Sequence, residues 1–161
     1  YYAWFNTFKP LLEGMEASFY EGRASRALHT DICSPVATDP TWSKLDKANR
    51  KILESDGGPL WHRLLKELQP QIVALSVARQ HLERIEFAPI TEWQVIHVFK
   101  RTGDGKPRSR PYEFRGRWYE VGGGRTLFVF GEAAQRPFGS LHATQKREAG
   151  ALSIEAYRNG P

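Results

Sequence analysis

The feature that most constrains the fold of this chain is an amphipathic helix pattern that leads directly into a short apolar segment. Leucine and tryptophan side chains recur at helical spacing from Leu60 to Leu68, and Pro70 ends the pattern. Residues 71–77 then form an apolar run of strand length, which is typical of a central parallel strand buried on both faces. A helix followed by such a strand is the sequence form of a strand–helix–strand unit, so the sequence predicts an α/β fold.

Further elements are predicted on both sides of this unit. Asp46 is expected to cap a helical piece that ends near residues 57–58, and Pro59 is expected to open the next helix. Gly- and Pro-containing turns at residues 102–107 and 122–124 separate the later strands. The predicted strands are 26–32, 71–77, 93–99, 112–121 and 126–131, and the other predicted helices are 2–13, a short one through 80–85, and 144–157.

Composition indicates one folded domain over residues 1–161. Hydrophobic residues make up 40% of the chain and charged residues 25%, which is a globular balance. Cys33 has no second cysteine to pair with, which fits a reducing, cytoplasmic environment. No apolar run approaches the roughly 20 residues that cross a bilayer. We therefore expect a monomer in the cytoplasm, without a membrane partner, a metal or a cofactor.

The two ends of the sequence suggest a piece of a longer domain. The chain starts at Tyr1 without an initiator methionine, directly in the helical pattern of residues 2–13. It ends in Asn-Gly-Pro at residues 159–161, which is helix-stop chemistry. We expect a first strand, and an active-site loop, upstream of Tyr1.

The first candidate site is the polar end of the predicted strand at residues 26–32. Strand side chains alternate between faces, so His29 and Asp31 are expected to point the same way. Two polar groups on one face of an apolar strand are costly unless they are paired or lie in a cleft. Two interpretations stay open: a cleft in which both side chains act, or a turn-forming Asp31 beside a packed, hydrogen-bonded His29.

The second candidate site is the loop of residues 135–142, between the last predicted strand and the last helix. Loops at the carboxyl ends of strands are where open α/β sheets bind ligands. Lys146 and Arg147 stand in the first turns of the helix, against its dipole, which suggests that they serve an external anion. The alternative is a plain strand–helix connection with solvated Lys and Arg.

Positive charge is concentrated in one short segment. The net charge of the chain is +5, which favours encounter with polyanions without specifying one. In residues 100–117 only Asp104 and Glu113 are acidic. The basic residues of this segment are Lys100, Arg101, Lys106, Arg108, Arg110, Arg115 and Arg117.

The order of these elements resembles the uracil-DNA glycosylase superfamily. There an apolar strand ends in a polar base-recognition residue, an amphipathic helix and a buried strand follow, and a late loop of the form His-Pro-Ser-x-Leu inserts into DNA. Residues 28–32 resemble the base-recognition strand, and residues 60–77 the helix and central strand. Residues 136–142 resemble the insertion loop, with Leu141 at the intercalating position. The resemblance implies a three-layer α/β/α sandwich with a central, mostly parallel sheet, in which the basic β-hairpin is an insertion.

The resemblance also implies an activity, DNA repair by base excision. Such an enzyme flips a base of DNA into a pocket and hydrolyses its N-glycosidic bond. Asp31 or His29 would read the edge of the base, and His142 is a candidate catalytic residue. The residues implied to contact DNA are Arg136, Ser140, Leu141, Lys146 and Arg147.

Three points depart from the family pattern. The recognition residue is commonly Asn, whereas a carboxylate at Asp31 only accepts hydrogen bonds and suits an amino-bearing base better than uracil. The His of the insertion motif is replaced by Arg136, although His142 is near. The family's water-activating motif precedes its first long helix, so it is expected upstream of Tyr1.

Two other functions stay open at this level. Aromatic residues alternate with arginines in residues 100–118, as in a non-catalytic module that binds nucleic acid through charge and stacking. The same alternation is what a half-buried hairpin looks like. The third possibility is an unrelated α/β enzyme that acts on a small nucleotide or sugar. The sequence contains no Ser-His-Asp order and no nucleotide-binding fingerprint that would support it.

Overall fold

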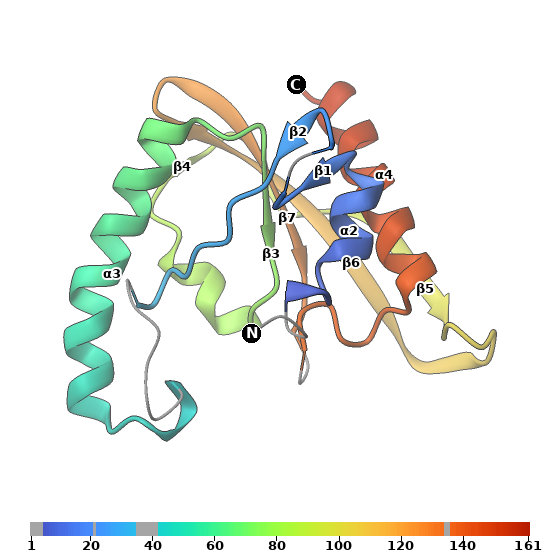
Figure 1. The fold of residues 1–161 in the computed structure, drawn as a ribbon, viewed down its shortest axis with the longest axis horizontal. Coiled ribbons are helices and arrows are strands. Elements are labelled where there is room, and N and C mark those ends of the chain that lie inside the picture. Colours follow the sequence, from blue (N-terminus) through green and yellow to red (C-terminus); the bar gives the residue numbers. More distant parts are fainter. Residues whose placement is uncertain (1–4, 21, 35–41, 134–135) are drawn as a thin grey trace.

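The structure, a computed structural model, confirms the α/β class. It describes residues 5–20, 22–34, 42–133 and 136–161. A five-stranded sheet lies between two groups of helices, with α3 on one side and α2 and α4 on the other (Figure 1). The helices are α2 (Lys9–Gly14), α3 (Lys47–Leu68) and α4 (Ala143–Arg158), with 3-10 turns η1 (Trp42–Lys44) and η2 (Arg79–Arg84). The strands are β1 (Ala17–Ser18), β2 (Ser25–Arg26), β3 (Ile72–Leu75), β4 (Ala88–Pro89), β5 (Gln94–Arg101), β6 (Pro107–Val121) and β7 (Gly124–Gly131).

The sheet is mixed, so the expectation of a mostly parallel sheet is wrong for the described residues. The parallel pair joins β3 to β7, in the register Ala74↔Val129. Strand β6 pairs with β4, β5 and β7, in each case antiparallel. The reason is the shortness of the connections, because tight turns such as those at residues 102–106 and 122–123 can join only antiparallel neighbours.

The predicted strand at residues 26–32 is also wrong for most of its length. Only its first residue lies in a strand, β2, which pairs with β1 in a separate two-stranded sheet. Farther along, the polar side chains form hydrogen bonds that are not part of a β-sheet. Thr30 Oγ1 accepts from Trp61 Nε1 at 3.1 Å, and Asp31 Oδ1 accepts from the Cys33 N–H at 3.0 Å. Such local side-chain bonds compete with strand pairing.

Helix α3 is continuous where two helices were expected. Asp46 caps it as predicted, accepting from the Asn49 N–H at 2.9 Å, and the helix then runs through Pro59 to Leu68. Packing outweighs the local break, because Trp61 and Leu65 are buried on the sheet beyond the proline. Packing also explains why glycine stands at position 57 inside the helix, because a methyl group there would come within 3.0 Å of the Cys33 backbone.

Alternation along β7 builds a core on each face of the sheet. Phe128 and Phe130 point to the α3 side, where they pack with Trp61. Leu127 and Val129 point to the other side, toward α2 and α4. Both faces of β7 are therefore buried. The sequence predicted such a central strand at residues 71–77 instead, but β3 lies at the edge of the sheet, where Ile72, Val73 and Ala74 are only partly buried because β7 alone pairs with it.

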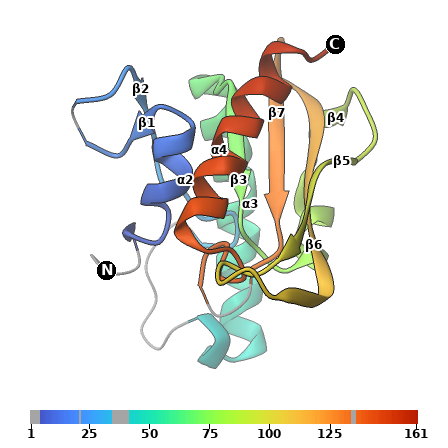
Figure 2. The same ribbon diagram turned by 90° about the vertical axis from the view of Figure 1, so that its right-hand side faces the viewer.

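The β5–β6 hairpin extends past the carboxyl end of β7. Phe114 is the first β6 residue that pairs with β7, whereas residues 107–113 pair on the β5 side. The hairpin turn thus reaches the start of α4 (Figure 2). No described helix is both long enough and apolar enough to span a membrane.

Candidate functional site

The carboxyl ends of β3 and β7 meet at one edge of the sheet, and the loops that follow them are bonded together. Ser76 Oγ accepts from the Phe138 N–H at 2.8 Å, and the Val77 carbonyl accepts from the Ala133 N–H at 3.1 Å. Residues 136–142 of the predicted loop are therefore anchored to the end of β3, the edge strand of the sheet, and Gln135 lies outside the described residues. This carboxyl edge is where ligands of open α/β sheets bind.

The loop turns its apolar side chains inward. Consecutive turns bond the Gly139 N–H to the Arg136 carbonyl at 2.8 Å, and the Leu141 N–H to the Phe138 carbonyl at 2.9 Å. Phe138 has a positive φ of 48° and is fully buried, and Leu141 is buried in the same core. Leu141, expected to insert into DNA, is therefore a core residue in this structure, because the turns point it at the sheet.

Lys146 also has a structural role, which the sequence did not indicate. Its side chain is buried, and Nζ donates to the carbonyls of Thr7 at 3.0 Å and Pro137 at 2.9 Å. Burial lowers the pKa of Lys146, and the nearby charge of Arg136 lowers it further. With its donors directed at two carbonyls, the ammonium ties the loop to the residues before α2 and does not face a phosphate.

Arg147 projects from α4 toward α2. Its Nε donates to Glu13 Oε2 at 2.8 Å, and about half of the side chain stays exposed. The pair links the two helices on the surface. Arg147 is thus partly neutralised, unlike Arg136, which is exposed in the loop itself.

His29 is connected to the loop of residues 136–142 by a series of aromatic contacts. Its ring is 5.4 Å from that of Phe5 and 5.7 Å from that of Phe8, and Phe8 in turn is 6.4 Å from Phe138. Burial lowers the pKa of His29, while the charge of Asp31 acts in the opposite direction. His29 is therefore a packed, neutral histidine near pH 7, as one of the two interpretations had it.

Asp31 forms a turn, which is also the plainer of its two interpretations. Its carboxylate is exposed and caps the Cys33 N–H. The negative charge of Asp31 also acts on Cys33 and His81, which lie at a cluster that the sequence did not predict. In this cluster Arg84 of η2 pairs with Glu54 of α3 at 2.7 Å. His81 belongs to this cluster, and its buried Nδ1 has no hydrogen-bond partner within the described part of the chain. Thirty residues separate Glu54 from Arg84, so no local pattern announces the pair.

The tip of the β5–β6 hairpin is docked on the start of α4. Arg108 donates from Nη2 to the Ser140 carbonyl at 2.6 Å and from Nε to the Arg101 carbonyl at 2.9 Å. Gln145 donates to the same Arg101 carbonyl at 2.8 Å. A methyl group at Gly103 would overlap His142, which begins α4 with an exposed side chain. The loop and the hairpin, separate in sequence, form one continuous edge.

The cations of this edge face solvent, whereas the aromatic rings of the hairpin do not. Phe114, Trp118 and Tyr119 are buried, so the alternation of residues 112–119 reflects a half-buried hairpin. Tyr112 is partly buried and donates its hydroxyl to the Glu132 carbonyl. We call the exposed cations of the hairpin and loop the basic rim: Lys100, Arg101, Lys106, Arg110 and Arg136.

The basic rim gathers exposed cations on one part of the surface. Its one acidic neighbour in the hairpin turn, Asp104, pairs with Lys106 at 3.0 Å. Grouped charges of one sign raise the local concentration of an oppositely charged partner. No family model matches the chain, and no curated protein or solved structure matches it.

Proposed function

We propose that this protein binds DNA at the carboxyl edge of its sheet and acts there as a base-excision glycosylase of the uracil-DNA glycosylase type. The observation that supports this best is the junction of the basic rim with the loop of residues 136–142, next to His29. In this proposal the fold is a three-layer α/β/α sandwich with the basic hairpin inserted, and the protein works as a monomer in the cytoplasm.

The roles divide between exposed and buried residues. Arg136, Ser140 and Arg147 contact the phosphate backbone together with the hairpin cations, because phosphate contacts position a protein on DNA. Asp31 reads the edge of the flipped base, with His29 behind it and His142 at the start of α4. The buried Phe138, Leu141 and Lys146 hold the loop in shape rather than touch DNA.

The experiment measures base excision from duplexes that each carry one deaminated base, with strand cleavage at the resulting abasic site as the readout. Asp31→Ala is expected to abolish excision with the fold intact, as checked by circular dichroism. Asp56→Ala removes an exposed aspartate from α3 and is the matched control. Excision by Asp31→Ala at the wild-type rate would overturn the assignment of the site.

A second candidate is a non-catalytic nucleic-acid-binding module that uses the hairpin of residues 100–118. It is favoured by one specific observation: the hairpin cations of the basic rim are exposed, whereas Leu141 and Lys146 are buried. This candidate predicts binding to undamaged duplex without excision of any base. If removing the charges of Lys100 and Arg110 weakens binding while Asp31→Ala changes nothing, the binding module is the correct function.

A further inference from the structure

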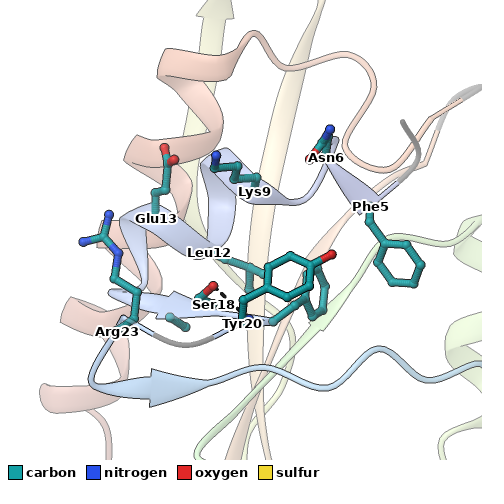
Figure 3. Close-up of a pocket in the computed structure, with 10 residues that line it drawn as sticks. Phe5, Asn6, Lys9, Leu12, Glu13, Ser18, Tyr20 and Arg23 are labelled. Carbon is teal, nitrogen blue, oxygen red and sulfur yellow. Dashed lines mark hydrogen bonds between the residues drawn. The ribbon is translucent and has the colours of Figure 1, made fainter. Parts of the chain in front are cut away.

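A separate cleft lies on the outer side of α2, between this helix and residues 17–20 and 23. It has a volume of about 240 Å³. Figure 3 shows side chains of α2 along one side of the cleft, Tyr20 on the other, and Phe5 and Arg23 at opposite ends. This volume is below the roughly 300–1,000 Å³ of sites for larger ligands, so the cleft suits one ring system.

Aromatic rings line this cleft. Phe5 and Phe19 meet edge to face, with ring centroids 5.4 Å apart. Tyr20 is 65% exposed, an unusual position for a tyrosine, and its backbone N–H donates to Ser18 Oγ at 3.0 Å, which holds the turn. An exposed ring on a fixed turn is a platform on which another flat ring can stack.

The charge of the cleft is positive. Lys9 and Arg23 are exposed on its lining, and neither makes an ion pair with another residue that the structure describes. The acidic residue of the lining, Glu13, is already paired with Arg147 at 2.8 Å. Asn6 adds an amide that both donates and accepts hydrogen bonds. The cleft therefore presents stacking surface, two cations and one amide.

We propose that this cleft binds a single unstacked nucleotide of a single-stranded nucleic acid. The base stacks on Tyr20 with its polar edge toward Asn6, and the flanking phosphates pair with Lys9 and Arg23. Phe5 also contacts His29, with ring centroids 5.4 Å apart, so one strand can run from the cleft to the carboxyl edge. The inference rests on the proposed function only in taking nucleic acid as the partner, and it needs no base excision.

The test is fluorescence anisotropy with a labelled oligothymidylate of eight nucleotides and the intact protein. Tyr20→Ala is expected to weaken binding about 5- to 150-fold, because stacking contributes about 1–3 kcal/mol per base. Tyr20→Phe keeps the ring and is expected to bind like the wild type. Arg23→Ala is expected to weaken binding and to lower the slope of log affinity against log salt by about 0.7.

The control and the opposing outcomes separate this site from the carboxyl edge. Lys51→Ala removes an exposed cation from α3 and should leave oligothymidylate affinity unchanged. Wild-type affinity in Tyr20→Ala would overturn the inference, as would Tyr20-dependent binding of an acidic phenylalanine-containing peptide in preference to the oligonucleotide. Loss of excision in Asp31→Ala with unchanged oligothymidylate binding would show that the two sites act independently.

Discussion

The loop of residues 136–142 and the tip of the β5–β6 hairpin are both basic in sequence and touch each other, yet they are built in opposite ways. The loop buries Phe138 and Leu141, and Lys146 behind it is buried as well. The hairpin tip exposes its cations and is held through Arg108. A basic segment thus keeps its cations exposed where the backbone directs their side chains away from the sheet, even though the segment itself is held in place by neighbouring residues.

The difference follows from the position of each segment relative to β7. The loop leaves the end of β7 and turns back over the sheet, where apolar side chains lose contact with water and stabilise it. The hairpin extends past β7, so residues 107–113 pair only on the β5 side, and the charged side chains of Arg110 and Glu113 stay in solvent. Five experiments test this difference and the packing behind it.

The largest effect is expected for Phe138→Ala in the loop. The side chain is fully buried and packs near Phe8 and Phe114, so its loss leaves a cavity and should cost about 3–5 kcal/mol of unfolding free energy. Urea denaturation measures this change. Ser140→Ala, exposed in the same loop, is the control and should change stability by less than about 0.5 kcal/mol. Equal effects of both variants would contradict an inward-facing loop.

The next effect is expected for Lys146→Met. The variant keeps an unbranched apolar stem but removes the donor to the Thr7 and Pro137 carbonyls, which should cost about 1–3 kcal/mol. Duplex DNA binding, measured in the same preparation, should change less than it does on removing a hairpin cation. A loss of DNA affinity without a loss of stability would place Lys146 at a phosphate instead.

The pH dependence of the same variant has a definite sign. Burial lowers the pKa of Lys146 in the folded state, whereas the unfolded chain keeps its proton up to about pH 10.5. Between these two values the unfolded state binds more protons, so rising pH favours the folded state. The stability advantage of wild type over Lys146→Met should therefore grow through the alkaline window below 10.5. Denaturation midpoints of both proteins at several pH values measure this trend.

A smaller effect, on binding rather than stability, is expected in the hairpin. Lys100→Ala and Arg110→Ala should each weaken duplex binding several-fold and reduce the slope of log affinity against log salt by about 0.9. Both residues are exposed, so neither change should move the unfolding free energy by more than about 0.5 kcal/mol. Lys51→Ala on α3 is the matched control. Unchanged salt slopes in both variants would remove the hairpin from the DNA-binding surface.

The smallest effect on stability is expected from two histidines: His29, near the carboxyl edge, and His81, in the cluster with Arg84 and Glu54. Burial lowers the pKa of His29 and of His81 below their ordinary 6.5. As pH falls below 6.5 the unfolded chain takes up protons that the folded state does not, so stability should decline toward acid. Thermal unfolding between pH 8 and 5 measures this decline, and His29→Gln with His81→Gln should flatten it. An equally steep decline in the double variant would assign the acid sensitivity to other groups.

Local elements with strong physical signatures could be predicted from the sequence. The apolar run of residues 71–77 contains the parallel strand β3, Asp46 caps α3, and the glycine turn near residue 122 joins β6 to β7. The long last helix, α4, was also predicted. Each depends on features that lie within a few residues of one another: side-chain periodicity, a capping oxygen or a glycine that adopts a positive φ. Such local features can be recognised in the sequence.

Which of these residues face solvent and which contact each other depends on the packing of distant elements. The pattern at residues 26–32 resembled a strand, but Thr30 and Asp31 bond to Trp61 and to the local backbone instead. Leu141 and Lys146 stood in a loop and a first helical turn that looked exposed, and the packing of α2 and α4 on the sheet buries both. Arg108 reaches the Ser140 carbonyl across 32 residues. Burial and long-range bonds depend on how distant elements pack, which no local pattern contains, and that packing determined both the inward loop and the exposed basic rim.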